Sequence, residues 1–228
     1  MIEKWVVSDK IIQMNNKRWL LVLLIIVFLV SSCSSPSLAN LITRSGGVLY
    51  KDDFSDPTSG WIRVLDTKGF MDYYSSGFRI WVNTPGYNYW STPGLQFKDV
   101  RINVDAARIG GPDENRFGLI CRYKDINNYY FFVISSDGYF GIGKVLNGLT
   151  SLLGQEMMSY TPSISPGLSP NHLQAVCDGD TLSFYINDQP VGLAIDTDLS
   201  SGDVGLLAGA FSNPGVDILF DNFVVTKP

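Results

Sequence analysis

The sequence predicts an all-β sandwich of short antiparallel strands. Runs rich in Val, Ile, Tyr and Phe recur along the chain, and Gly, Pro, Asn, Asp and Ser separate them at intervals of roughly 8–12 residues, as in sandwiches and barrels. From Cys33 onward no segment keeps a helical period over roughly ten residues, so we expect no helix there. Hydrophobic residues make up 45% of the 228 residues and aromatic residues 13%, which is enough for a packed core.

The amino-terminal segment, residues 1–32, has the organisation of a secretory signal. Lys17-Arg18 precede an uninterrupted apolar run over residues 19–30, which is shorter than the ~20 residues that a membrane-spanning helix needs. An uncleaved anchor helix is the alternative, and the short run weighs against it. Met14 would itself begin a signal of ordinary length, so the first 13 or so residues are a candidate start-site artefact.

Cys33 ends the pattern Leu-Val-Ser-Ser-Cys, which resembles a bacterial lipobox, where the cysteine is diacylated before cleavage. The resemblance implies a lipoprotein that is exported and lipid-anchored at the bacterial cell envelope, held to the membrane by acyl chains and not by a spanning helix. Residues 33–47 have no strong period and are expected to form a flexible tether. Residues 48–228 are expected to form the folded domain.

The charge of the chain excludes one class of partner. It carries 17 Lys and Arg against 22 Asp and Glu, a formal net charge of −5, and the part after the basic signal segment is more acidic still. Nucleic acid and anionic membrane surfaces are therefore poor partners.

A hairpin is predicted over residues 69–74 and 77–82. It turns through Ser75-Ser76, a weaker two-residue turn signal than Asn-Gly. Residues 84–94 are bounded at both ends by Pro-Gly and are expected to form a loop. Residues 96–109 then alternate apolar and polar side chains, which is typical of a strand with one solvent-exposed face.

The centre of the chain predicts a three-stranded antiparallel meander. Residues 117–123, 129–134 and 139–144 are rich in β-branched and aromatic residues. Residues 124–128 and 135–138 separate them with Asn, Asp, Ser and Gly, which favour turns.

Gly141 and Gly143 share one face of the last meander strand, so another backbone or a ligand could come close there. Residues 145–169 contain three prolines and are expected to form an irregular crossover loop or rim. Further strands are predicted at residues 172–177, 181–187, 191–195, 203–211 and 216–226.

The meander also carries a family resemblance. Arg-Tyr-x-Asp-x-x-Asn-Tyr-Tyr-Phe at residues 122–131 and Ser-Asp-Gly-Tyr at residues 136–139 resemble the exported laminin-G-like, concanavalin A-like jelly-roll domains of bacteria. The resemblance covers about residues 48–226 and implies a two-sheet antiparallel jelly-roll sandwich. It also implies that the first strand, residues 48–54, lies beside the closing run, residues 218–225.

Related jelly rolls often hold a structural calcium ion between their first and last strands. Asp52, Asp53 and Asp221 would meet there if the two ends pair, and oxygen-rich sites suit Ca²⁺. The resemblance therefore implies a structural calcium site at these aspartates, and we expect that no cofactor is required.

Cys33 is accounted for by the lipobox, which leaves Cys121 and Cys177, each inside a predicted strand. An even pair of cysteines in an exported chain predicts a disulfide. Two buried free thiols are the alternative, because a disulfide needs Cα atoms within about 7 Å and sequence spacing cannot show that.

Catalysis has little support in the sequence. After Cys33 the only glutamates are Glu114 and Glu156, whereas retaining glycosidases need two carboxyl groups about 5 Å apart. Most aspartates lie in predicted turns, where they bond to the local backbone. His172 is the only histidine, and no Gly-x-Ser-x-Gly element accompanies it.

Aromatic residues are the remaining candidates for a binding site. Tyr87, Tyr89 and Trp90 lie in the predicted loop at residues 84–94, and Trp81 lies just before it. Exposed aromatic clusters usually mark interaction sites, and sugars stack on such rings. Core or rim packing is the alternative for each of them.

These observations favour a surface-anchored lipoprotein with a non-catalytic glycan-binding or adhesion module, whose ligand is a polysaccharide or glycoconjugate. One alternative is an enzyme, because a family of jelly-roll domains acting on 3-keto-glycosides has a similar architecture. The other is a structural envelope module in which an exposed sheet edge or flat face binds a protein partner whose identity the sequence does not show.

Overall fold

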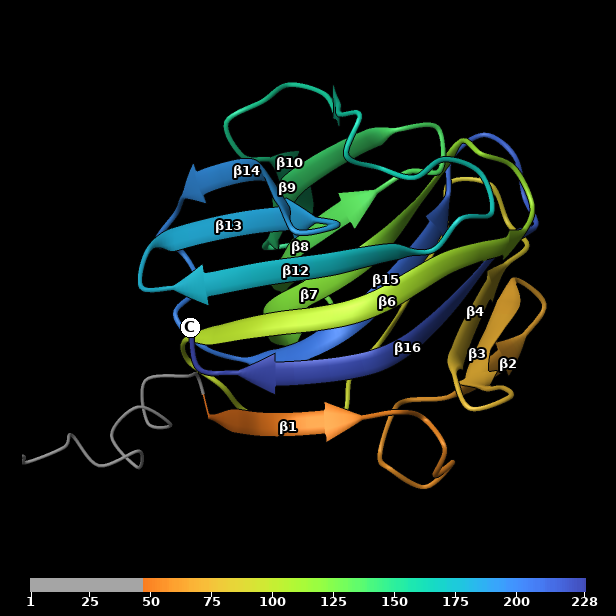
Figure 1. Cartoon of the computed structure of the whole chain (residues 1–228), viewed down its shortest axis with the longest axis horizontal. Coiled ribbons are helices and arrows are strands. Elements are labelled where there is room, and N and C mark those ends of the chain that lie inside the picture. Colours follow the sequence, from red (N-terminus) through yellow and green to blue (C-terminus); the bar gives the residue numbers. More distant parts are fainter. Residues whose placement is uncertain (1–46) are drawn as a thin grey trace, which may run out of the picture. The chain divides into compact units, whose positions relative to one another are not determined.

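The computed structural model describes residues 47–228, and every regular element in that range is a β-strand (Figure 1). Nine strands form one sheet, in the order β14-β13-β12-β6-β16-β4-β3-β2, with β1 added beside β16. Its strands are β1 (Val48–Asp52), β2 (Val64–Asp66), β3 (Gly69–Tyr73), β4 (Phe78–Val82), β6 (Val100–Gly110), β12 (Asn171–Asp178), β13 (Thr181–Ile186), β14 (Gln189–Ile195) and β16 (Val216–Thr226).

Seven strands form the second sheet, in the order β10-β9-β8-β7-β15-β5, with β11 added beside β9. In Figure 1 this sheet lies behind the first. Its strands are β5 (Asn88–Ser91), β7 (Asn115–Asp125), β8 (Asn128–Ile134), β9 (Tyr139–Leu146), β10 (Leu149–Leu152), β11 (Ser159–Tyr160) and β15 (Asp203–Ala210). All pairings in both sheets are antiparallel, so the predicted two-sheet, all-β architecture is confirmed.

The main core lies between the two sheets. In β6, Val100, Ile102, Val104 and Ala106 are buried while the residues between them are partly exposed, as the alternating pattern predicts. The predicted disulfide is present: Cys121 of β7 and Cys177 of β12 are bonded, with their Cα atoms 6.9 Å apart. It therefore joins one strand of each sheet across the core.

The two ends of the domain lie side by side, as predicted. β1 pairs with β16, and Asp52 lies opposite Phe223. The meander is also confirmed, because β7, β8 and β9 are consecutive neighbours. At the predicted two-residue hairpin, Ser75 and Ser76 both have positive φ, 50° and 58°, the conformation of a type I′ turn.

Two predictions of irregular structure were wrong in part, because short strands interrupt both segments. Residues 84–94 contain a strand, β5, which pairs with β15 along residues 206–209. The Pro-Gly pairs bound this strand at each end and do not mark one continuous loop. Residues 145–169 contain β10 and β11, which both pair with β9. Backbone pairing at the edge of a sheet therefore organises a segment whose prolines suggested an irregular loop.

Within residues 47–228 no helix is long and apolar enough to cross a membrane. The signal segment, Cys33 and nearly all of the tether lie outside the described residues. Lipidation at Cys33 therefore stays a prediction.

Candidate ligand-binding site

A second apolar cluster covers the outer face of the seven-stranded sheet, away from the main core. The strand β8 is apolar at nearly every position, so Tyr130, Phe132 and Ile134 reach the core while the alternate residues point outward. The buried members of this outer cluster are Ile120, Tyr129, Phe131, Val133, Val145 and Leu207. Trp90, Tyr123, Leu152 and Met158 pack against them and are partly exposed.

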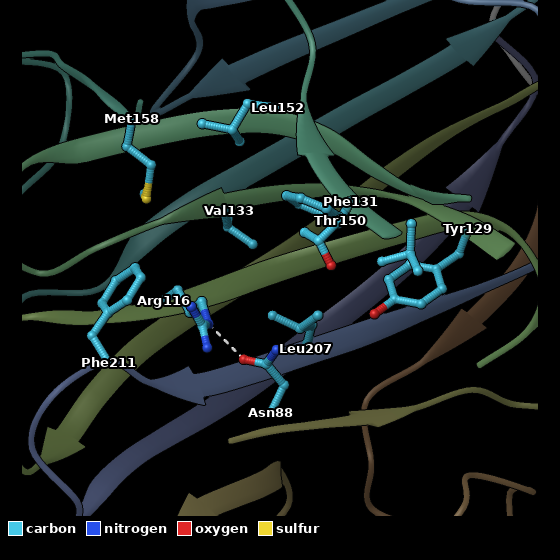
Figure 2. A pocket seen from close by; sticks show the side chains of 11 residues that line it. Asn88, Arg116, Tyr129, Phe131, Val133, Thr150, Leu152, Met158, Leu207 and Phe211 are labelled. Atoms are coloured by element: carbon cyan, nitrogen blue, oxygen red, sulfur yellow. Dashed lines mark hydrogen bonds between the residues drawn. The ribbon is translucent and has the colours of Figure 1, made fainter. Parts of the chain in front are cut away.

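A pocket of about 200 Å³ opens in this cluster (Figure 2). Phe131, Val133 and Leu207 supply apolar surface from the sheet, and Leu152 and Met158 come from the segment after β9. This volume is smaller than the roughly 300–1,000 Å³ of pockets that take drug-sized ligands. The pocket therefore suits a single ring and not a long stretch of ligand.

The segment after β9 builds one wall because β9 has glycines beneath it. A Cβ atom on Gly141 would lie 3.0 Å from Leu152 Cδ2, and one on Gly143 would lie 2.6 Å from the carbonyl oxygen of Ser151. The expectation of a close approach at these glycines is confirmed. The neighbour is the chain's own segment, which forms the predicted rim.

Polar side chains from four strands, β5, β7, β8 and β10, line the pocket. Arg116, Asn88, Tyr129 and Thr150 line it, and Figure 2 shows the hydroxyl group of Tyr129 directed toward the other lining residues. Among the described residues, no hydrogen-bond partner contacts the hydroxyl groups of Tyr129 and Thr150. Polar groups without partners in an apolar pocket can orient a ligand.

Arg116 and Asn88 form a bridge across β15. Both lie opposite Gly209 in the register of the three strands, and Arg116 Nε donates to Asn88 Oδ1 at 2.5 Å. A Cβ atom at position 209 would lie 1.9 Å from Asn88 Oδ1. The glycine therefore leaves the space that this hydrogen bond occupies.

Burial shapes the electrostatics of the site. Desolvation lowers the pKa of Arg116, and the nearby Tyr129 opposes that effect. Desolvation, followed by the neighbouring Tyr123, raises the pKa of Tyr129 to about 12. The phenol is therefore neutral at physiological pH and can donate or accept a hydrogen bond.

Two aromatic rings pack against Tyr129. The ring of Trp90 stacks on it with centroids 6.2 Å apart, and the ring of Tyr123 lies 5.7 Å away. Trp90 Nε1 donates to the hydroxyl oxygen of Tyr123 at 3.2 Å. These contacts hold the phenol ring in place at the edge of the pocket.

Solved structures of other proteins share this architecture. No protein-family description and no curated protein matches the chain. Among solved structures, the carbohydrate-binding module CBM66 from Bacillus subtilis aligns with a TM-score of 0.60 and 22% identity, over 74% of this chain and 96% of the module. A Bacillus subtilis protein of unknown function with a galectin-like fold aligns with a TM-score of 0.62 and 15% identity, over 80% of this chain and 96% of that one.

A GH43 protein, BlXynB from Bacillus licheniformis, aligns with a TM-score of 0.59 and 17% identity, over 78% of this chain and 39% of that one. This chain has a concanavalin-like jelly-roll fold. At these identities the likeness establishes the fold of the jelly roll and not its ligand.

The jelly roll separates the four aromatic residues predicted to bind a ligand. Tyr89 faces the main core, is only 4% exposed and donates a hydrogen bond to Asp66. Tyr87 packs against the same core, and Trp81 lies on the other sheet against Phe70, with ring centroids 5.7 Å apart. The prediction of one exposed aromatic loop was therefore wrong.

Trp90 alone belongs to the outer cluster beside the pocket. The physical reason is the strand period of two, which sends neighbouring residues of β5 to opposite faces.

The aspartates proposed for calcium have other contacts. Asp52 is buried and accepts hydrogen bonds from the Phe54 backbone N–H at 2.8 Å and from Trp61 Nε1 at 2.9 Å. Asp221 accepts from the backbone N–H of Asn222. Within residues 47–228 no three acidic, His or Cys side chains are placed to hold one metal ion. Calcium binding therefore stays a prediction that the geometry of these aspartates does not support.

His172 lies far from this pocket, on the outer face of the nine-stranded sheet. Its Nδ1 is 2.7 Å from Asp105 Oδ1, and Asp105 also accepts a hydrogen bond from Asn222. Both side chains are about two-fifths exposed, at 40% and 43%.

Sequence reasoning missed Arg116, Tyr129 and Asn88 as pocket residues. One signal was available, because a strand that is apolar on both faces, as β8 is, needs a cover on its outer face. The sequence does not show the bridge over Gly209, because Gly209 lies in β15, far along the chain from both Arg116 and Asn88.

Proposed function

We propose that the chain is a non-catalytic glycan-binding module and that the pocket on the seven-stranded sheet is its binding site. The observation that carries this proposal is the pairing of apolar, aromatic walls with hydroxyl and guanidinium groups that have free hydrogen-bonding capacity. A sugar has flat C–H faces and hydroxyl groups around its ring, so it needs both apolar surface and hydrogen-bonding groups in a binding site. The shared fold with a carbohydrate-binding module supports the proposal.

The composition of the pocket favours binding over hydrolysis. All of its lining residues fall in the described part of the chain, and none of them is Asp, Glu or His. Glycosidases place two carboxyl groups on either side of the bond that breaks. The fold is also shared with a GH43 protein, but that likeness concerns the architecture alone.

The proposal includes export and attachment to the membrane through lipid on Cys33, supported by the lipobox-like pattern at residues 29–33. Replacing Cys33 by Ala should remove the protein from the membrane fraction, because the short apolar run cannot anchor it after cleavage. Equal retention of the wild-type and variant proteins in detergent-phase partitioning would overturn this part.

Binding is tested by applying the full chain to a glycan array and then titrating each ligand into wild-type protein and variants. Tyr129→Phe removes one hydroxyl group that has no partner among the described residues. It should weaken binding about three- to tenfold and leave the melting temperature unchanged, since one hydrogen bond contributes about 0.5–1.5 kcal/mol.

Tyr185→Phe is the matched control, because Tyr185 lies in β13 of the other sheet and is partly exposed. It should bind like the wild type. An array without any bound glycan would overturn the proposed function, and equal affinities of the two variants would overturn the placement of the site.

A further inference from the structure

Among the described arginines, Arg116 and Arg101 form no ion pair, and of these two only Arg116 lines the apolar pocket. Four arginines form ion pairs with aspartates: Arg63 with Asp72, Arg79 with Asp217, Arg108 with Asp113 and Arg122 with Asp99. Arg116 forms none with any residue of the described chain. Its contacts are neutral: the Asn88 side-chain oxygen at 2.5 Å, the Ala210 carbonyl oxygen at 3.3 Å and the Phe211 ring, 4.5 Å from the guanidinium carbon.

The surroundings of Arg116 make this lack of a counter-ion costly. Val133, Leu207 and Met158 line the same pocket, so part of the guanidinium group has lost its water without gaining a negative charge. Buried or partly buried charges are normally paired, because desolvation penalises the charged form. The lowered pKa of Arg116 has the same cause.

One nitrogen of Arg116 is available to a ligand. Nε and one terminal nitrogen donate to Asn88 and Ala210, whereas the other terminal nitrogen has no hydrogen-bond partner among residues 47–228. Each terminal nitrogen carries two N–H groups, so the free nitrogen can bind one carboxylate oxygen while the second N–H of its neighbour remains for the other oxygen. Such charge-assisted bonds are stronger than neutral ones.

We propose that the pocket binds a sugar ring that carries a carboxylate, such as a hexuronic acid, with the carboxylate on Arg116. This inference rests on the proposed function and names its ligand class. The hydroxyl groups of Tyr129 and Thr150 then remain for the ring hydroxyl groups. The net charge of −5 opposes long-range attraction of an anion, so the selectivity arises from this one local contact.

The test compares sugars that differ only in the acid group. The full chain is titrated by calorimetry with the methyl glycosides of glucuronate and glucose, and with those of galacturonate and galactose. In at least one pair the acid should bind ten times or more tightly than the neutral sugar, which corresponds to about 1.4 kcal/mol. Equal affinity within both pairs would overturn this inference and leave the proposed function intact.

Variants assign the preference to Arg116. Arg116→Gln should remove the preference for the acid while neutral sugars still bind, and Arg116→Lys should keep part of it because the charge remains. Arg101→Gln is the matched control, since Arg101 is a partly exposed arginine of β6 on the other sheet. It should behave like the wild type.

Melting temperatures show whether each variant folds. If Arg116→Gln does not fold, the comparison of acidic with neutral sugars on the wild-type protein still tests the inference. An acid preference that survives in folded Arg116→Gln would overturn the assignment. If no sugar of either pair binds and the array is also empty, the proposed function fails, and this inference fails with it.

Discussion

At the scale of single residues, β5 shows how two adjacent side chains take different roles. Tyr89 is buried against the main core and hydrogen-bonded to Asp66, whereas its neighbour Trp90 lies in the outer cluster against Tyr129. Both residues are aromatic and neither is near a charge in the sequence. Their roles therefore depend on which sheet face each residue meets.

Tyr89→Ala should lower the free energy of unfolding by about 3–5 kcal/mol, as for other large aromatic residues in cores, without changing ligand affinity in the folded protein. Trp90→Ala should weaken ligand binding more than it lowers stability, because it removes the ring that supports Tyr129. Urea unfolding and calorimetry on both variants measure the two effects. The reverse pattern would contradict the placement of these two residues.

Asp196 couples stability to pH. Burial alone would raise its pKa, but hydrogen bonds from Lys144, at 2.5 Å, and from Tyr130, at 2.6 Å, lower it below the ordinary value of 3.8. A lowered carboxyl pKa stabilises the folded state above the ordinary pKa, and that stability is lost as the pH falls through the folded-state value.

Asp196→Asn should therefore destabilise the protein by about 1.5–3 kcal/mol at neutral pH, and this difference should shrink as the pH falls below 3.8. Urea midpoints of both proteins, measured from about pH 6 down to about pH 2.5, provide the test. A difference that stays constant over the whole range would show that the ionised form of Asp196 is not what stabilises the fold.

At the scale of elements, the β3–β4 hairpin folds with residues that its turn does not favour. Ser75 and Ser76 both adopt positive φ, where a side chain costs roughly 1–2 kcal/mol per residue. The backbone groups of Tyr74 and Gly77 still close the turn with two hydrogen bonds, at 2.7 and 2.9 Å. Strand pairing and the core residues Phe78 and Ile80 therefore overcome the turn's preference.

Replacing Ser75-Ser76 by Asn-Gly should raise the free energy of unfolding by about 1 kcal/mol, because these residues favour a type I′ turn. Thermal and urea unfolding measure the gain. The control is Ser212→Gly, at an exposed position without positive φ, which should give no gain. A loss of stability in the Asn-Gly variant would contradict the assigned turn geometry.

At the scale of the whole molecule, a disulfide bond cross-links the two sheets. Cys121 and Cys177 are fully buried and 56 residues apart in the chain. Closing a loop of that length restricts the unfolded chain, which by chain-entropy arithmetic stabilises the fold by about 4 kcal/mol.

Replacing both cysteines by alanine should lower the free energy of unfolding by about 4 kcal/mol while the strand content stays the same. Intact-mass measurement after non-reducing alkylation checks the bond itself, and urea unfolding of the oxidised, reduced and variant proteins checks its contribution. Two alkylated thiols in the folded, oxidised protein would show that the bond does not form.

The all-β class, the central meander and the hairpin over residues 69–82 follow from local patterns, because strand period and turn preference are properties of neighbouring residues. The pairing of β1 with β16 was anticipated from a family resemblance, and the disulfide from the even number of cysteines.

The pocket does not follow from local sequence patterns, because its residues come together only in the tertiary structure. Arg116, Gly209 and Asn88 meet because β15 lies between β7 and β5, and that neighbourhood depends on which distant strands pair. Sequence alone placed Tyr89 and Trp90 in one loop, because it shows aromatic character but not which sheet lies on either side. The charge of Arg116 is evident from the sequence, whereas its lack of a counter-ion among residues 47–228 depends on the tertiary arrangement of the strands around it.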